Sequence, residues 1–152
     1  MAEYRPAVSV VIIFLDPGAA FLREAIASVQ SQTLRDWELL LVDDGSTDDS
    51  TALARAAVAA DPERIHYLEH PGHANRGMSA SRNRGIEAAR GRYLAFLDAD
   101  DVYLPERLEH HVQILERHPE AVGHGDHVER AVGVDRPGRR DTHVAFAHAF
   151  RL

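Results

Sequence analysis

Short apolar runs alternate with helix-forming stretches along the first 120 residues, and this alternation restricts the possible folds more than any other feature of the chain. Four runs have the length and the composition of buried strands: 8–14, 37–42, 65–68 and 93–97. Four segments have apolar residues at helical spacing or helix-forming composition: 21–32, 50–60, 79–89 and about 105–118. Strands that alternate with helices form a parallel sheet covered on both faces. The sequence therefore predicts an α/β fold with a doubly wound, mostly parallel sheet, in which 8–14 is a central strand.

The composition is that of one globular domain. The chain has 152 residues, of which 45% are hydrophobic and 27% charged, and such a chain buries a core without disulfides or structural metals. It contains no cysteine, which excludes thiolate zinc sites and a cysteine nucleophile and fits a reducing, cytoplasmic location. No signal peptide and no apolar run of membrane-spanning length are visible. The net charge of -7 disfavours nucleic acid and anionic lipid as partners.

All 17 basic residues are arginines. A Walker-type phosphate loop and a Schiff-base mechanism each require a lysine, so both are excluded. Phospho-accepting receiver domains and haloacid-type phosphatases also carry acidic clusters at strand ends, but they use a lysine to hold the phosphoryl oxygen. The absence of lysine therefore disfavours these two classes as well.

Acidic residues follow two of the predicted strands. Asp43 and Asp44 end the second strand, and Asp98 and Asp100 follow the fourth. The carboxyl ends of parallel strands meet at one edge of the sheet, where ligands of such folds bind. Alternate carboxylates suit a hard divalent ion that bridges a diphosphate, and a carboxylate at a strand end can accept an N–H of a nucleobase. Each cluster also fits an acidic turn that caps the next helix, with Asp48, Asp49 or Ser50 as candidates after the second strand.

Basic and aromatic side chains outside these clusters suggest further candidates. Arg82 lies in a loop-to-helix segment whose amides and guanidinium groups can hold phosphate oxygens, although an arginine on a solvated helix face is an equal alternative. His110 and His111 are adjacent on a helix and point roughly 100° apart, so they cannot chelate one ion and are predicted to be surface residues. Trp37 begins a strand and is predicted to lie in the core or at its rim.

Several ordered motifs, including Val-Asp-Asp-Gly-Ser and Asp-Ala-Asp, resemble the amino-terminal half of family 2 glycosyltransferases. The motifs lie at 8–12, 21–33, 37–48, 81–85 and 91–101, and the resemblance covers about residues 7–120. It implies a GT-A fold, in which a Rossmann-like nucleotide-binding half precedes an acceptor-binding half. It also implies inverting transfer from a nucleotide-sugar donor, a UDP-sugar, to a saccharide or lipid-linked acceptor of cell-envelope polysaccharide synthesis, with Mn²⁺ or Mg²⁺ as cofactor.

The resemblance assigns roles to individual residues around the base. Asp44 matches the family carboxylate that reads the nucleobase, and Asp43 is its neighbour in the motif. Ile13 and Asp16 occupy the region that flanks the base, where the commoner family pattern is Pro-Thr-Tyr-Asn. The sequence departs from that pattern here, so the family's side-chain contacts do not carry over directly.

The remaining implied roles concern the diphosphate and the metal. Asp100 matches the metal ligand of the Asp-x-Asp motif, and Asp98 is directed at the ribose or at a metal-bound water. Arg82 is the candidate for the phosphate oxygens. Inverting members also need an Asp or Glu further along the chain as general base, and no such residue is recognisable here.

The composition changes at about residue 121, and the chain then contains no Ile, Ser, Asn, Gln, Tyr or Trp. We predict a nucleotide-sugar-binding domain over 1–120 and an atypical tail over 121–152, poorly ordered or translated out of frame, so that the fold is incomplete on the acceptor side. Resequencing the gene tests the out-of-frame hypothesis. The alternative to an active transferase is a noncatalytic nucleotide-binding fragment without the general base and the acceptor domain.

Overall fold

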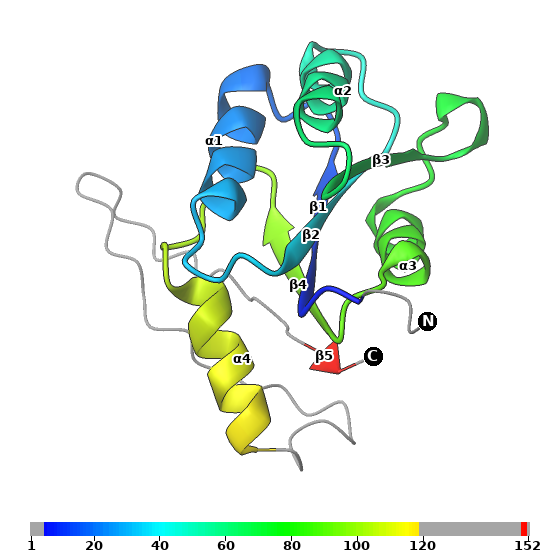
Figure 1. Cartoon of the computed structure of the whole chain (residues 1–152). Coiled ribbons are helices and arrows are strands. Elements are labelled where there is room, and N and C mark those ends of the chain that lie inside the picture. Colours follow the sequence, from blue (N-terminus) through cyan, green and yellow to red (C-terminus); the bar gives the residue numbers. More distant parts are fainter. Residues whose placement is uncertain (1–4, 119–149, 152) are drawn as a thin grey trace, which may run out of the picture.

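The computed structural model describes residues 5–118 and 150–151, which form one mixed sheet with flanking helices (Figure 1). The strands follow the order β3-β2-β1-β4-β5; the first four are parallel, and β5 pairs antiparallel with β4. Their bounds are β1 Val8–Phe14, β2 Trp37–Asp43, β3 Ile65–Glu69, β4 Tyr93–Asp98 and β5 Phe150–Arg151. The four predicted strands are confirmed, with ends that differ by one residue at most.

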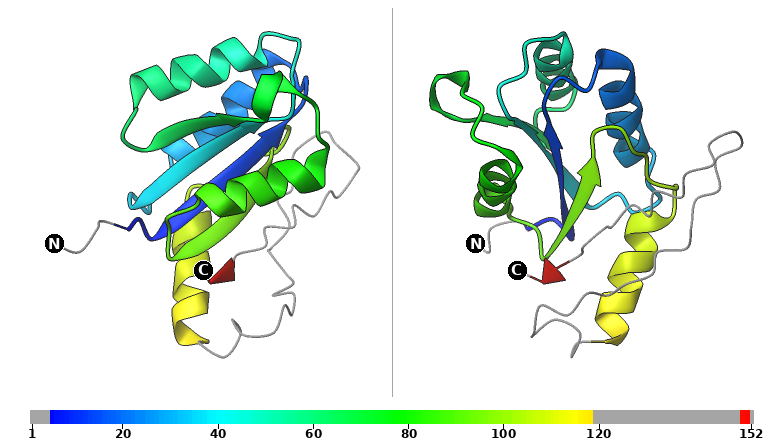
Figure 2. Two further views of the ribbon diagram at one scale, coloured as in Figure 1. Left: turned by 90° about the vertical axis from the view of Figure 1, so that its right-hand side faces the viewer. Right: turned by 180° about the vertical axis from the view of Figure 1, so that it is seen from behind.

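Helices cover both faces of the sheet, as a doubly wound fold requires (Figure 2). α1, α2 and α4 share one hydrophobic cluster with the sheet, and α3 packs on the opposite face. The helix bounds are α1 Ala19–Gln30, α2 Ser50–Ala60, α3 Met78–Ala88 and α4 Arg107–Arg117, with a short 3₁₀ turn η1 at Pro71–His73. In the part of the chain that the structure describes, no helix is long and apolar enough to cross a membrane. The cytoplasmic location stays a prediction.

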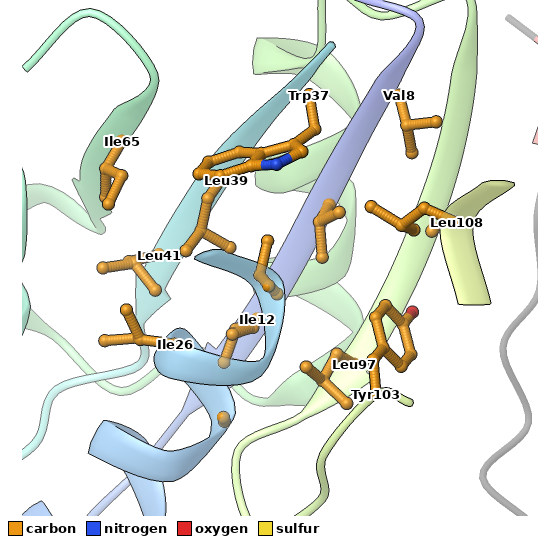
Figure 3. Close-up of a cluster of buried hydrophobic side chains, with 14 of the residues drawn as sticks. Val8, Ile12, Ile26, Trp37, Leu39, Leu41, Ile65, Leu97, Tyr103 and Leu108 are labelled. Carbon is orange, nitrogen blue, oxygen red and sulfur yellow. The ribbon is translucent and has the colours of Figure 1, made fainter. Parts of the chain in front are cut away.

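β1 is buried on both faces because successive side chains of a strand point to opposite sides. Val10 and Ile12 belong to the cluster that faces α1, whereas Val11 belongs to the cluster that faces α3. Figure 3 shows Ile12 beside Ile26 of α1 in the first of these clusters. The expected central position of this strand is therefore confirmed.

Two side chains bear on the expectations for aromatic and imidazole groups. Trp37 is 1% exposed, in the core, and the guanidinium carbon of Arg64 lies 4.3 Å from the centroid of its ring. His110 is exposed, as expected. The prediction was wrong for His111, which is half-buried; burial, together with the charges of Arg107 and His110, lowers its pKa to about 4. The hydrophobic periodicity of α4 predicted which residues form its apolar stripe. It did not predict how far the rest of the protein covers the side chains beside that stripe.

The strand register brings acidic residues to one edge of the sheet. Asp43 pairs with Phe14 on one side and with Glu69 on the other, and Asp98 pairs with Ile13. These residues end or nearly end their strands, and parallel strands all end at the same edge. Carboxylates from β2, β3 and β4 are therefore gathered at the edge where the loops to the helices begin.

Gly91 sets the close contact between the start of β4 and β1, and we predict that Gly91→Ala destabilises the fold. A Cβ atom at this position would lie 2.5 Å from the backbone nitrogen of Ser9 and 2.8 Å from the carbonyl carbon of Val8. Because these are backbone atoms of a central strand, the strand must shift, and we expect a loss of about 1–3 kcal/mol in the free energy of unfolding. Urea denaturation measures this loss. Glu87→Ala, at an exposed position of α3, is the control, and an equal midpoint for both variants would contradict the prediction.

Candidate functional site

The candidate site lies where the loops leave the carboxyl ends of β1, β2, β3 and β4. Three of these loops, 15–18, 44–49 and 70–77, are connected by hydrogen bonds from backbone N–H groups to carboxylates. The fourth loop, 99–106, carries the Asp-Ala-Asp motif's last residues. The geometry of the site therefore depends on which carboxylate accepts hydrogen bonds from which loop.

Asp43 is fully buried, and its carboxylate holds the beginning of loop 44–49. Its Oδ1 accepts the N–H of Ser46 at 2.7 Å, and its Oδ2 accepts the hydroxyls of Thr51 and Tyr67. Burial alone would raise the pKa of Asp43, but the bonds from Thr51, Ser46 and Tyr67 hold that pKa below its ordinary value. The carboxylate is ionised and occupied within the protein, so its expected contact with a nucleotide stays a prediction.

Asp44 is also buried, and it connects the end of β2 to the beginning of α3. Its Oδ1 accepts the N–H of Arg76 at 2.8 Å, and the N–H of Gly77 points to both carboxylate oxygens at 3.1 Å. Its own N–H donates to the carbonyl of Phe14. Gly77 is the residue before α3, where the helix dipole favours a negative charge. Asp44 is thus held at a helix N-terminus, on the opposite side of β2 from the partners of Asp43.

Asp16 connects loop 15–18 to loop 44–49. Its carboxylate accepts the N–H groups of Thr47 at 2.6 Å and of Asp48 at 3.0 Å. In return, the Asp48 carboxylate accepts the N–H of Gly18, before α1, and that of Ser50, the first residue of α2. Of the three candidates for a cap of α2, Asp48 accepts the N–H of the first helical residue, whereas Asp49, the N-cap residue, makes no side-chain cap hydrogen bond. Asp16 has a bracing function that the sequence did not reveal.

Asp98, Asp100 and Asp101 form an acidic cluster after β4. One carboxylate oxygen from each lies within 4.8 Å of the others, Asp98 and Asp100 being exposed and Asp101 half-buried. A turn brings them together, in which the N–H of Asp101 donates to the carbonyl of Asp98 at 3.0 Å. The structure places the two predicted metal ligands side by side and adds Asp101, which was not included as a ligand. Carboxylate oxygens that face open solvent are the donors that Mn²⁺ and Mg²⁺ take, so the donor set fits the implied ion.

Arg82 and Ile13 lie on the α3 side of the sheet. The Arg82 guanidinium carbon is 5.3 Å from the centroid of the Phe96 ring, and Arg82 is exposed. Phe96 precedes Asp98 by two residues, so both side chains leave the same face of β4. Ile13 is half-buried and packs against the cluster on this face. Arg82 therefore shares one side of the sheet with the acidic cluster, while its expected contact with phosphate stays a prediction.

A ring of hydrogen bonds surrounds the end of β2 and was not found by sequence reasoning. The Tyr67 hydroxyl lies 3.0 Å from Asp43 Oδ2 and 2.9 Å from Glu69 Oε2. The His73 ring bridges Glu69, at 2.7 Å, and the carbonyl of Ser46, at 2.8 Å. The Ser46 N–H closes the ring on Asp43. The sequence offered one signal, an acidic residue after the third predicted strand.

Solved structures share this arrangement of strands and helices. The mannosyltransferase PcManGT from Pyrobaculum calidifontis, in complex with GDP-Man and Mn²⁺, matches with a TM-score of 0.69 at 22% identity, over 97% of this chain and 45% of that one. S. aureus TarS 1-349 in complex with UDP-GlcNAc matches with a TM-score of 0.65 at 21% identity, over 74% of this chain and 32% of that one. These similarities confirm the predicted Rossmann-like GT-A fold.

Comparison of the sequences identifies the family. The sequence model of glycosyl transferase family 2 matches residues 9–151. An uncharacterized protein of Sinorhizobium fredii is 42% identical over 118 residues, 76% of this chain and 12% of that protein. An uncharacterized glycosyltransferase of Nostoc sp. is 37% identical over 118 residues, 78% of this chain and 35% of that protein. The chain belongs to the family 2 glycosyltransferases and spans about a tenth to a third of the length of these two relatives.

The predicted boundary between the domain and the tail falls outside the described residues. Residues 119–149 and 152 fall outside them, so the predicted change at 121 and the predicted character of the tail stay predictions.

We predict that Asp43→Asn destabilises the protein in a pH-dependent way. An amide offers one oxygen where the carboxylate accepts three hydrogen bonds, and we expect a loss of about 1–3 kcal/mol at pH 7. Because the folded state lowers the pKa of Asp43, its contribution is present above the pKa of the unfolded state and is lost as the pH falls through the folded value. Urea denaturation of both chains between pH 7 and pH 3 should show the difference shrinking on acidification. A difference that is constant with pH would contradict the assignment of an ionised Asp43.

Proposed function

We propose that this chain is the donor-binding part of a glycosyltransferase whose donor is a nucleotide-sugar, a UDP-sugar. The enzyme transfers the sugar with inversion to a saccharide or lipid-linked acceptor of cell-envelope polysaccharide synthesis. The observation that carries the proposal is the meeting, at one edge of the sheet, of the Asp44 loop and the cluster of Asp98, Asp100 and Asp101 in a family 2 chain. Matched structures hold UDP-GlcNAc in one case and GDP-Man with Mn²⁺ in another.

Asp44 supports the nucleobase part of the proposal. A carboxylate has about four lone-pair sites, and Asp44 uses three of them, one for the N–H of Arg76 and two for the N–H of Gly77, which points to both oxygens. It therefore retains capacity for one further donor, such as the imide N–H of uracil. Its immobile position, fixed by backbone groups, suits recognition of a flat base. Asp43 acts in this proposal by positioning the loop, and Asp16 and Ile13 border the base from β1.

The acidic cluster supports the metal part of the proposal. Asp98, Asp100 and Asp101 would hold a divalent cation, Mn²⁺ or Mg²⁺, through carboxylate oxygens. When bound, such an ion supplies Lewis-acid stabilisation of the leaving diphosphate. Arg82, on the same side of the sheet, would donate to a phosphate oxygen.

We predict that UDP binds the chain in a Mn²⁺-dependent manner and that Asp100→Asn weakens this binding at least about tenfold, because one charged oxygen ligand is lost. Isothermal titration with UDP, with and without Mn²⁺, measures the effect, and GDP in a parallel titration tests the choice of base. Glu87→Gln removes an equal charge from an exposed position of α3 and should bind like the parent chain.

Two outcomes would alter the proposal. A chain that is folded by circular dichroism but binds neither nucleotide contradicts it. Nucleotide binding without sugar transfer to any offered acceptor favours the noncatalytic module.

A further inference from the structure

His73 connects two loops of the site through both nitrogens of its ring. Nδ1 lies 2.7 Å from Oε2 of Glu69 at the end of β3, and Nε2 lies 2.8 Å from the carbonyl oxygen of Ser46 in loop 44–49. A carbonyl oxygen and an ionised carboxylate only accept hydrogen bonds. Both ring nitrogens must therefore carry a proton, which makes His73 an imidazolium.

The surroundings of Glu69 keep its carboxylate ionised. The hydrogen bond from His73 lowers the pKa of Glu69, as does the Tyr67 hydroxyl, whose one proton is shared with Asp43, and Nη2 of Arg55 on α2 lies 3.7 Å from Oε1 of Glu69. The Ser46 carbonyl and Glu69 in turn raise the pKa of His73, and the negative charge of Asp43 on β2 adds to this. The neighbouring imidazole of His70 makes a hydrogen bond with the hydroxyl of Ser81 at 2.9 Å, and its Nε2 also lies 3.7 Å from Oδ1 of Asp44.

The backbone shows that the two loops are in close contact at this point. His73 has a φ of 54°, in the left-handed region that few residues other than glycine adopt, and Gly72 before it has a φ of 70°. A Cβ atom at Gly45 would lie 2.9 Å from the nitrogen of Asn75 and 3.1 Å from the carbonyl oxygen of His73. The ring bonds of His73 thus hold an unusual backbone conformation against loop 44–49.

We propose that His73 is a positioning residue for the nucleotide site, whose doubly protonated ring clamps loop 44–49 to loop 70–77. The clamp holds Asp44 from both directions. Ser46, two residues after Asp44, is bound by the His73 ring, and the Asp44 carboxylate is bound by Arg76 and Gly77 of the same loop as His73. This inference rests on the proposed function, because it assigns His73 to the placement of the carboxylate that would contact the base.

Loss of one ring proton breaks the clamp. A neutral imidazole donates from one nitrogen only, so its other nitrogen would face an acceptor with a lone pair. The folded state raises the pKa of His73 above its ordinary value of about 6.5, so the clamp is present below the folded pKa and is lost as the pH rises through it. We expect nucleotide affinity to fall about threefold to tenfold over this rise, the effect of one hydrogen bond.

The experiment is a titration of the full chain with UDP at constant Mn²⁺ from pH 6 to pH 8.5. His73→Asn removes the ring but tolerates the positive φ, and we expect it to bind about threefold to tenfold more weakly than the parent at pH 6. Glu69→Gln keeps an acceptor but removes its charge, so we expect the pH at which affinity falls to move downward. His110→Asn, at an exposed position of α4, is the control: its affinity should change with pH as that of the parent chain does, including the titration of the nucleotide and the metal themselves.

The outcomes separate the two proposals. If the parent chain binds UDP and His73→Asn binds equally well at every pH, the positioning role is overturned while the proposed function stands. If the folded parent chain binds neither UDP nor GDP at any pH, the proposed function fails and the role of His73 at a nucleotide site falls with it.

A second measurement needs no nucleotide. The C2 proton of the His73 ring, followed by NMR against pH, should titrate with a midpoint above 6.5 that Glu69→Gln lowers. A midpoint at or below 6.5 overturns the clamp even if the His73→Asn chain does not fold.

Discussion

Carboxylates that accept backbone N–H groups determine the shape of this edge of the sheet. A loop that leaves a buried strand loses its ladder partners, and each buried N–H needs another acceptor. Here Asp43 accepts the N–H of Ser46, Asp44 accepts that of Arg76, and Asp16 accepts that of Thr47. The loops have defined positions because acidic side chains accept the hydrogen bonds that the sheet no longer provides. Acidic residues therefore build the site before any ligand enters it.

This construction concentrates negative charge, and the fold compensates for it locally. The amino-terminal ends of α1 and α2 point N–H groups at the carboxylate of Asp48, and that of α3 points one at Asp44; helix N-termini carry partial positive charge. His73 supplies a full positive charge between loops, and Arg55 lies over the ring of Tyr67 at 4.3 Å. The acidic cluster after β4 instead brings three carboxylates within 4.8 Å of one another, two of them exposed. It is the part of the edge that is best suited to an external cation.

The strands and helices could be predicted because each has either a hydrophobic pattern or a helix-forming composition, and a clear end. Buried runs stop where Asp or Gly begins, and this also revealed Asp43, Asp44, Asp98 and Asp100 as candidates. The partners of these residues could not be predicted. Tyr67 and Glu69 meet Asp43 only because β3 pairs with β2 in one register, and sequence spacing does not contain that register. The bracing function of Asp16 likewise depends on how two loops approach each other.

The alternation of side chains along β2 explains why two adjacent acids have different functions. Asp43 follows Leu39 and Leu41 onto the face of α1 and α2, where Thr51 and Tyr67 enclose it. Asp44 continues to the other face, where it meets the beginning of α3.

That second face is also the face of Phe96 and hence of Asp98, since side chains two apart on a strand share one side. Consecutive side chains of a strand point to opposite faces of the sheet, so two adjacent acids at the end of a strand that is buried on both faces lie on different sides. One acid then becomes a structural bridge, and the other is left on the side of the sheet that Arg82 and the acidic cluster also occupy. The position of the proposed donor site on the α3 side therefore follows from the parity of the strand as well as from the motif.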